Sequence, residues 1–373
     1  MTPSIDITEI PLGHTHVDDG EWGAFLRDNL VADLAPWLPR RPLRANDTLH
    51  LYESLMARHH LHSVFHLVLI YNNRIYWPTR TDVGGTEHPH LASPYVSAGP
   101  RWCAPSRNCS VPLLSLIKSV GEPDGDDTDL LIPQFLNGAA AAPTYPWHMK
   151  KDVAFFRGAP FCSGYWIKRQ LTRCANLCPR AYLAHLSALD ADANRQPPVL
   201  DVGLVEPYVV GPGPDECVPT APPVVPRVPL ANHSYYRWLL HVEGVTASNR
   251  LSQLLLTNSL VVSQHASTPW VEWYYRSLRP GVHFVPFWNT TPAGADDVYD
   301  VISELRRRDA EDPSHAQRII GAAQRFAARL TGFHARVRYL ADALAAYKAL
   351  FADMDPFLEQ YVGQLRARGF KIP

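Results

Sequence analysis

Two arginines stand where buried strands are expected to end. Arg157 closes the apolar run 150–158, directly before Gly158, and Arg250 follows a second apolar run and the turn at Gly244. A guanidinium group holds phosphate through paired hydrogen bonds and stays charged at physiological pH. In open α/β sheets, ligands bind beyond the carboxyl ends of the strands. The two positions therefore predict a phosphate-binding site, and the sequence around Arg250 defines that site best.

The segment 233–287 is predicted to alternate strands and helices. We expect a strand over 238–242, a glycine turn, a helix with Arg250 one turn in, a strand over 259–263, an aromatic helix and a strand over 282–287. The first-turn amides and the positive end of the helix dipole would then face a diphosphate. The residues expected to let the backbone approach it are Gly244, Val245, Thr246, Ala247 and Ser248, and the Ser248 hydroxyl can also donate.

Each candidate also has a purely structural interpretation. An arginine in the first turn of a helix is usually a solvated surface residue, and Arg157 could hold its strand end through an ion pair. His233, before the strand, could touch the base or ribose of a nucleotide, or be a buried structural histidine. Glu272 in the expected aromatic helix fits a helix N-terminal residue better than a ribose contact.

Overall charge and length limit the class of protein. The 35 basic and 36 acidic residues give a net charge of −1, so there is no basic field to hold nucleic acid or an anionic membrane. The sequence has no run of about eighteen apolar residues, the length needed to span a bilayer. Residues 1–22 lack the pattern of a signal peptide. On this basis we expect a cytoplasmic protein, or a lumenal one if the chain has been trimmed.

At 373 residues the chain is too long for one ordinary core, which predicts two domains. A shift to small residues after 136 places the first boundary near 145, giving ranges of 1–145, 146–330 and a helical 331–373. Further expected elements are an amphipathic helix over 22–38, a hairpin turning at Asn72-Asn73, and buried strands over 111–119 and 127–135. A helix over 164–178, a strand-like region from there to about 210, and helices opened by Asp296 and Pro313 are also expected.

Cysteines and acidic residues offer weak metal signals. Cys103 with Cys109, and Cys174 with Cys178, are close enough for local disulfides, but six cysteines are ordinary for this length and the favoured interpretation is that they are unremarkable thiols. No pair of cysteine motifs has zinc spacing. The acidic string 126–129 lies in a Gly/Pro turn and is interpreted as a solvated loop. We therefore expect no metal site.

Two short patterns resemble glycosyltransferase family 90, the group of Rumi-like protein O-glucosyltransferases and capsule-associated xylosyltransferases. The first is aromatic-Arg-Gly at 156–158 after the Trp-x-x-Lys-Lys of 147–151. The second is the Gly-x-x-Ala-Ser-x-Arg of 244–250. The early hairpin is similar to the family's as well. The resemblance spans roughly residues 60–350 and is specific only around these two patterns.

The resemblance implies an α/β, GT-B-like fold in which two Rossmann-like domains face a cleft. Residues 1–145 would form the acceptor side, 146–330 would bind the nucleotide sugar through Arg157, Gly158, His233 and the 244–250 loop, and 331–373 would pack back on the first domain. It also implies a catalytic aspartate between about 80 and 105, where Asp82 and Glu87 are the acidic residues and Asp82 is the better match.

The chain departs from its relatives at two points. It lacks the sequence context of the family's aspartate, and it has Ala159-Pro160 where many relatives carry a further basic residue, a role that Lys168 or Arg169 could take. We predict an inverting, metal-independent transferase that moves glucose or xylose from a UDP-sugar to a hydroxyl of a glycan or protein, with no other cofactor. The departures favour one alternative, a catalytically silent UDP-sugar- or glycan-binding protein.

Overall fold

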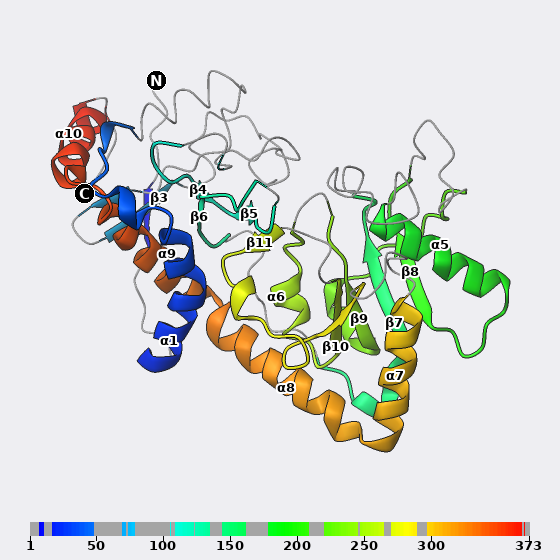
Figure 1. The fold of residues 1–373 in the computed structure, drawn as a ribbon. Coiled ribbons are helices and arrows are strands. Elements are labelled where there is room, and N and C mark those ends of the chain that lie inside the picture. Colours follow the sequence, from blue (N-terminus) through cyan, green and yellow to red (C-terminus); the bar gives the residue numbers. More distant parts are fainter. Residues whose placement is uncertain are drawn as a thin grey trace. The chain divides into compact units, whose positions relative to one another are not determined.

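A computed structural model describes residues 7–10, 17–47, 69–71, 74–78, 105, 109–122, 124–134, 144–161, 178–208, 220–244, 247–264, 270–288, 297–367 and 369 (Figure 1). The chain forms two compact units. Unit 1 combines residues 1–136, 271–275 and 333–373, and unit 2 combines 137–270 and 276–332. The functional roles given above to the ranges 1–145, 146–330 and 331–373 stay predictions.

Unit 2 is built on a five-stranded parallel sheet in the order β12-β10-β9-β7-β8. From β7 the chain first adds a strand on one side, β8, and then adds β9, β10 and β12 on the other side. The order therefore reverses between β7 and β9, and such a reversal is where doubly wound α/β domains bind ligands. The strands are β7 (Lys151–Gly158), β8 (Leu200–Leu204), β9 (Tyr236–His241), β10 (Leu260–Gln264) and β12 (Val285–Phe287).

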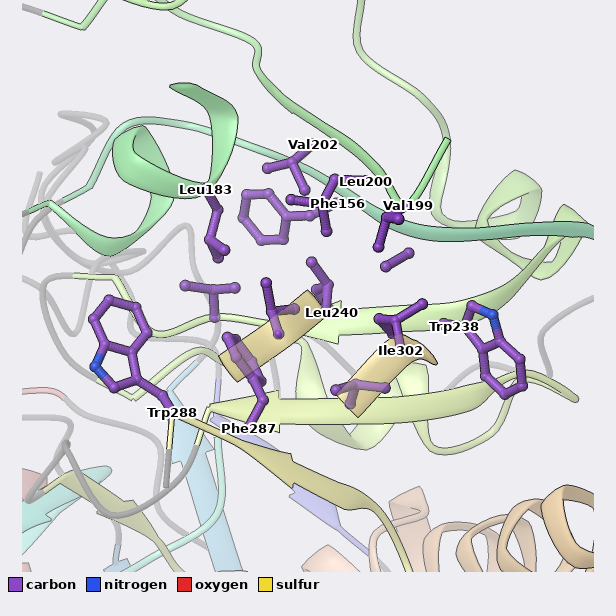
Figure 2. Close-up of a cluster of buried hydrophobic side chains, with 14 of the residues drawn as sticks. Phe156, Leu183, Val199, Leu200, Val202, Trp238, Leu240, Phe287, Trp288 and Ile302 are labelled. Atoms are coloured by element: carbon purple, nitrogen blue, oxygen red, sulfur yellow. The ribbon is translucent and has the colours of Figure 1, made fainter. Parts of the chain in front are cut away.

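These strands are apolar on both faces, as expected for parallel strands covered on both sides. Successive side chains alternate between the faces. One face carries Phe156, Trp238 and Leu240, which pack with Leu183 and Ile302 from two helices (Figure 2). Phe155 lies outside this cluster and stacks on Tyr236 at the start of β9, with ring centroids 3.8 Å apart. The predicted mixed α/β fold with a parallel, Rossmann-like sheet is confirmed for this unit.

Unit 2 contains four α-helices in its described part. They are α5 (Pro179–Asp192), α6 (Leu251–Leu254), α7 (Val298–Glu311) and α8 (Pro313–Leu330). Pro179 and Pro313 occupy first-turn positions, where the missing amide hydrogen costs nothing. The Asp312 side chain accepts from the amide of Ser314 and so caps α8. Asp297 precedes α7, but its carboxylate accepts from the amide of Trp288 instead of capping the helix.

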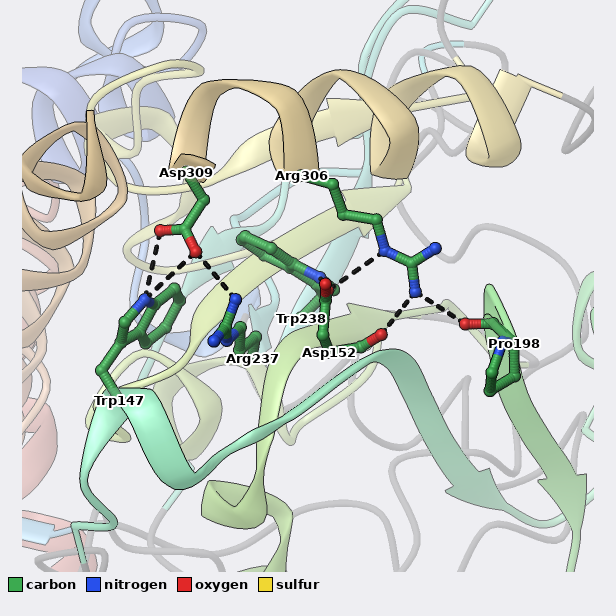
Figure 3. A network of polar contacts seen from close by, with 7 residues as sticks. All are labelled: Trp147, Asp152, Pro198, Arg237, Trp238, Arg306 and Asp309. Carbon is green, nitrogen blue, oxygen red and sulfur yellow. Dashed lines mark hydrogen bonds and ion pairs between the residues drawn. The ribbon is translucent and has the colours of Figure 1, made fainter. Parts of the chain in front are cut away.

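Helix α7 is fastened to the amino ends of the strands (Figure 3). Asp309 accepts from Arg237 of β9 at 2.9 Å and from the indole of Trp147 at 3.1 Å. Arg306 donates to Asp152 of β7 at 3.1 Å and to the carbonyl of Pro198 at 2.6 Å. This network lies at the end of the sheet opposite Gly158 and Gly244. Its contacts are structural, and it leaves the carboxyl ends of the strands for binding.

Unit 1 holds an aromatic cluster made from three distant segments. Phe25 of α1 (Asp19–Leu26) lies 5.5 Å from Trp273 and 5.9 Å from Tyr339 of α9 (Phe333–Lys348), measured between ring centroids. Helix α1 continues through a π turn (Arg27–Val31) into α2 (Ala32–Leu34), in agreement with the helix expected there. Helix α10 (Met354–Ala367) follows α9. The cluster explains why residues 271–275 belong to this unit.

The strands of unit 1 form small sheets in the described part of the chain. The predicted hairpin is confirmed, since β2 (Leu69–Tyr71) pairs antiparallel with β3 (Arg74–Pro78), which also pairs with β1 (Ile7–Ile10). The predicted buried strands are present as three short ones: β4 (Leu114–Ser115) is parallel to β6 (Leu130–Leu131), and β5 (Ile117–Ser119) pairs with β11 (Trp270–Glu272). A second Rossmann-like sheet stays a prediction.

The acidic string after β5 is not a solvated loop, and that prediction was wrong. Asp127 and Asp129 are buried, and each accepts a hydrogen bond that holds the short strands. The carboxylate of Asp127 accepts from the amide of Ser119 at 2.9 Å, and that of Asp129 accepts from the Ser115 hydroxyl at 2.7 Å. Burial, the largest cause, raises the pKa of Asp129 to about 7.

Two other predicted elements were wrong in kind. The aromatic segment is a strand, β11, followed by a 3-10 turn (Tyr275–Ser277), so Glu272 is a buried strand residue and not a helix N-terminal one. The sequence after Cys178 was expected to be strand-like, yet it forms α5 before β8 begins. The helix expected over 164–178 falls almost wholly outside the described residues. No helix in the described part is long and apolar enough to cross a membrane.

Both cysteines in the described part of the chain, Cys109 and Cys178, are in disulfides. The expectation of ordinary thiols was therefore wrong for these two residues. Their partners lie outside the described residues, so the local pairings with Cys103 and Cys174 stay predictions.

The amino-end network predicts a stability defect without a binding defect. Replacing Arg237 by Met leaves the Asp309 carboxylate, only 7% exposed, without its ion partner, which should cost about 3 kcal/mol of unfolding free energy. Urea unfolding of Arg237→Met measures this loss. Arg307→Met on the same helix removes only solvent-exposed pairs with Glu304 and Glu311 and should hardly move the midpoint. Equal midpoints for the two variants would contradict the assignment.

A candidate phosphate site at the carboxyl ends of β7 and β9

The site lies where the strand order of unit 2 reverses. Strand β7 ends at Gly158 and its neighbour β9 ends at His241, with Val242, Glu243 and Gly244 continuing beyond it. Because the two strands are parallel, both carboxyl ends open on the same edge of the sheet. The apolar pattern of each strand was sufficient to predict this edge.

Arg157 is engaged in an ion pair, as its structural interpretation expected. Its Nη2 lies 2.5 Å from Oδ1 of Asp201 on β8, and its Nη1 donates to the Asp201 carbonyl at 2.8 Å. The guanidinium also lies over the ring of Phe155, 4.7 Å from its centroid. The pair fixes the guanidinium at the strand end and offsets part of its charge. A contact with phosphate stays a proposal.

Arg250 lies beside Arg157 at the same edge. Its Nη1 donates to the carbonyl oxygen of Arg157 at 2.7 Å, and its guanidinium lies 5.2 Å from the centroid of Phe156. The structure therefore brings together two residues 93 positions apart. It also explains Gly158, because a Cβ there would stand 2.7 Å from the Phe156 ring and 3.5 Å from Arg250 Nη2.

His233 is buried in the same cluster of charges. It lies in a 3-10 helix (Leu230–Tyr235) with its ring 4.9 Å from that of Phe155, and only 4% of it is exposed. Burial first, and then the positive charges of Arg250 and Arg157, lower the pKa of His233 to about 4. The imidazole is therefore neutral at pH 7. This agrees with its interpretation as a buried structural histidine, and a contact with base or ribose stays a prediction.

A third arginine, Arg180, was missed in the sequence. It stands in the first turn of α5 and is buried. It donates to the carbonyls of Ala159 beyond β7 at 3.1 Å, and of Val242 and Glu243 beyond β9 at 3.0 Å each. A Cβ on Gly244 would lie 3.0 Å from Arg180 Nη2, which is why this position is glycine. If α5 had been predicted, its start at Pro179-Arg180 would have placed an arginine in the first turn of a helix beside the strand ends, and Arg180 would have become a candidate.

The loop after β9 departs from its prediction in two ways. Arg250 is the N-cap residue of α6 and not one turn into it, and α6 has only four residues, so little helix dipole can act there. In addition, the backbone amide of Ser248 donates to a carboxylate oxygen of Glu243. An internal anion thus occupies one of the amides expected to face the diphosphate. Ala247 and Ser248 are buried, and Val245 and Thr246 lie outside the described residues.

Other candidates cannot be placed on this edge. Asp82, Glu87, Lys168 and Arg169 lie outside the described residues, so their roles stay predictions. Glu272 belongs to unit 1, where burial raises its pKa to about 8 against the opposing charge of Arg336. Within the described ranges, no group of three or more His, Cys, Asp or Glu side chains could hold a metal ion.

The fold and these three arginines define unit 2 as a doubly wound α/β domain with a cationic edge at its switch point, an arrangement typical of nucleotide-binding domains. Comparison with known families agrees with this class. The model of glycosyl transferase family 90 matches residues 135–362, more than half of the chain, and the protein therefore belongs to that family.

Similar proteins carry names from the same family. The O-glucosyltransferase rumi homolog of Aedes aegypti is 32% identical over 146 residues, covering 39% of this chain and 30% of that protein. Protein O-glucosyltransferase 1 of Mus musculus is 42% identical over 64 residues, covering 17% and 16%. The matches thus span less than a third of either relative's length. A crystal structure of Anabaena HepE in complex with UDP-glucose is a distant likeness, with a TM-score of 0.30, 14% identity, and 52% and 49% covered.

The neutral, buried His233 predicts a pH-dependent stability. The unfolded state binds a proton near pH 6.5 but the native histidine only near pH 4, so stability falls as pH drops below 6.5. Between pH 7 and pH 5 this histidine should account for about 2 kcal/mol of lost unfolding free energy. Denaturation at both pH values should therefore show a smaller pH difference in His233→Asn than in the unmodified protein. An identical pH difference would contradict the neutral assignment.

Proposed function

We propose that this protein is a glycosyltransferase that moves glucose or xylose from a UDP-sugar to a hydroxyl group of a glycan or protein. The observation that carries the proposal is the gathering of Arg157, Arg180 and Arg250 at the switch point of a doubly wound sheet in a family 90 chain. Positive charge at that edge suits the diphosphate of a nucleotide sugar. The names of the matched relatives and the resemblance at 156–158 and 244–250 agree with it.

In the proposed reaction the bond between the anomeric carbon and the diphosphate oxygen breaks, and a bond to the acceptor oxygen forms on the opposite face of the sugar. UDP leaves with the bonding electrons. Negative charge grows on its diphosphate as the bond breaks, and a preorganised guanidinium stabilises that charge more in the transition state than in the bound donor. The acceptor proton passes to a carboxylate, for which Asp82 is the proposed base.

Of the three cations, Arg250 is the one we assign to the diphosphate. Arg180 uses its guanidinium to tie strand ends together, and Arg157 is offset by Asp201. Arg250 is the arginine of the 244–250 pattern, and the Arg157 carbonyl and the Phe156 ring hold its guanidinium at the edge of the sheet. Arginines in this role make a metal ion unnecessary, so we propose metal-independent transfer and expect turnover to survive EDTA.

We also propose the GT-B-like pairing of two domains that the family implies, with the acceptor bound by residues of the 1–145 range. For the compartment, disulfides at Cys109 and Cys178 are typical of proteins that fold in oxidising surroundings. They favour the lumenal alternative over the cytoplasmic one. Counting free thiols in the protein taken from its own cells would decide between the two.

The affinity for UDP tests the assignment of Arg250 to the diphosphate. Arg250→Ala should weaken UDP binding about a hundredfold in isothermal titration, because a charge-assisted contact with the diphosphate is lost. Arg250→Lys should recover only part of it, since a lysine lacks the paired donors. Arg307→Met, on the far surface of α7, is the matched control and should bind UDP normally. Unchanged UDP affinity in Arg250→Ala would show that the phosphate lies elsewhere.

Release of UDP from a UDP-sugar distinguishes an enzyme from a catalytically silent binding protein. With UDP-glucose or UDP-xylose, the protein should release UDP slowly by hydrolysis, as transferases do when water replaces the acceptor. Asp82→Asn should lower turnover with an acceptor at least a hundredfold, because general-base catalysis is lost, while the affinity for UDP stays the same. UDP-sugar binding with no UDP release, and no effect of Asp82→Asn, would favour the silent alternative.

A further inference from the structure

Two buried side chains hold the peptide groups of Ser248 from both sides. The amide of Ser248 donates to Oε2 of Glu243, and its carbonyl oxygen lies 3.4 Å from Nε2 of His241. Glu243 and His241 are each only 2% exposed. The carbonyl of Ser248 also accepts from the amide of Leu251 at 3.3 Å, which begins α6. Ser248 is thus the point where the loop is fixed and the helix starts.

His241 and Glu243 together form what we call the Ser248 clamp. On the histidine side of this clamp the tautomer of the imidazole ring follows from its two contacts. A carbonyl oxygen only accepts, so Nε2 of His241 must carry the hydrogen. Burial, the largest cause, lowers the pKa of His241 to about 3, so the ring is neutral and Nδ1 is an acceptor. The hydroxyl of Ser263 lies 2.9 Å from Nδ1 and 3.4 Å from the carbonyl oxygen of Gln264, so we assign its hydrogen to the nearer Nδ1. Ser263 therefore orients the ring, and the ring orients the Ser248 carbonyl.

The glutamate side is anchored equally firmly. The backbone amide of Glu243 donates to Oε1 of Gln264 at 3.0 Å, and its carbonyl accepts from Nε of Arg180. Ser263 and Gln264 are consecutive residues at the end of β10. The clamp on the 244–250 loop is therefore attached to the neighbouring strand of the sheet on both its sides, and its position is set by strand pairing.

We propose that Glu243 and His241 are positioning residues for donor binding, which fix the Ser248 peptide and thereby place Arg250, two residues further on, against the diphosphate. This inference rests on the proposed function. The Glu243 carboxylate already holds the amide of Ser248, so that amide is not used for the phosphates. The diphosphate is then held by the Arg250 guanidinium and the Ser248 hydroxyl, which are side-chain contacts.

To position the Ser248 peptide, the side chain at 243 must accept a hydrogen bond, but it does not need a negative charge. Glu243→Gln keeps an oxygen that can accept from the Ser248 amide and removes a charge that repels phosphate. Its UDP affinity should lie within about threefold of the unmodified protein. Glu243→Ala leaves the amide without its acceptor and frees the loop, so its dissociation constant for UDP should rise about tenfold. Rescue by glutamine separates an acceptor role from a charge role.

The test pairs UDP titration with hydrogen exchange of the free protein over 244–254. Glu243→Ala should lose protection in this segment and bind UDP about tenfold more weakly, and Glu243→Gln should keep both. Glu206→Ala, which removes an exposed carboxylate paired with Arg227, is the control and should change neither. If Glu243→Ala does not fold, His241→Phe keeps a ring of similar size, removes both hydrogen bonds and should give the same two losses.

Two results would overturn the inference. One is normal protection or normal UDP affinity in a folded Glu243→Ala or His241→Phe, which would mean that the clamp does not set the loop for the donor. The other is an equal loss in Glu243→Gln and Glu243→Ala, which would mean that charge and not acceptance matters. Failure of the proposed function is distinguished by the unmodified protein itself, which would then bind no UDP while the exchange measurement still reports on the clamp.

Discussion

The parallel pairing of β7 with β9 is the constraint on which the candidate site depends. It places the ends of two segments far apart in the chain on one edge, and the hydrogen bond from Arg250 to the carbonyl of Arg157 spans 93 residues as a result. Without this pairing the arginines would be unrelated surface cations. Because the strand order reverses here, the edge is also left open by the connections that cover the sheet elsewhere.

The two ends of this sheet have different chemistry. At the amino end, α7 is fastened by ion pairs, in which Arg237 pairs with Asp309 and Arg306 pairs with Asp152 (Figure 3). At the carboxyl end, arginines gather around glycines that permit close approach, and buried histidines stay neutral beside them. The first arrangement is suited to stability and the second to binding an anion.

The carboxyl end is nevertheless not a bare cluster of cations. Asp201 forms an ion pair with Arg157, and the Glu243 carboxylate accepts a hydrogen bond from the amide of Ser248. Arg180 donates hydrogen bonds to three backbone carbonyls. These internal contacts hold the edge together in the absence of a ligand. We propose Arg250, the arginine of the 244–250 pattern, for the phosphate contact, and these internal contacts would preorganise its loop for a donor.

Sequence patterns determined the local chemistry and the class of fold. Apolar runs predicted β7, β9 and β10 because parallel strands are buried on both faces, and the spacing of 156–158 and 244–250 identified the family. What depended on long-range contacts could not be predicted. The aromatic segment became the strand β11 because it pairs with β5, the acidic string was buried by the strands that it ties, and α5 with its Arg180 was missed. Only the tertiary structure decided that Glu243, and not a bound phosphate, meets the amide of Ser248, because that choice rests on Gln264 and Ser263 from a neighbouring strand.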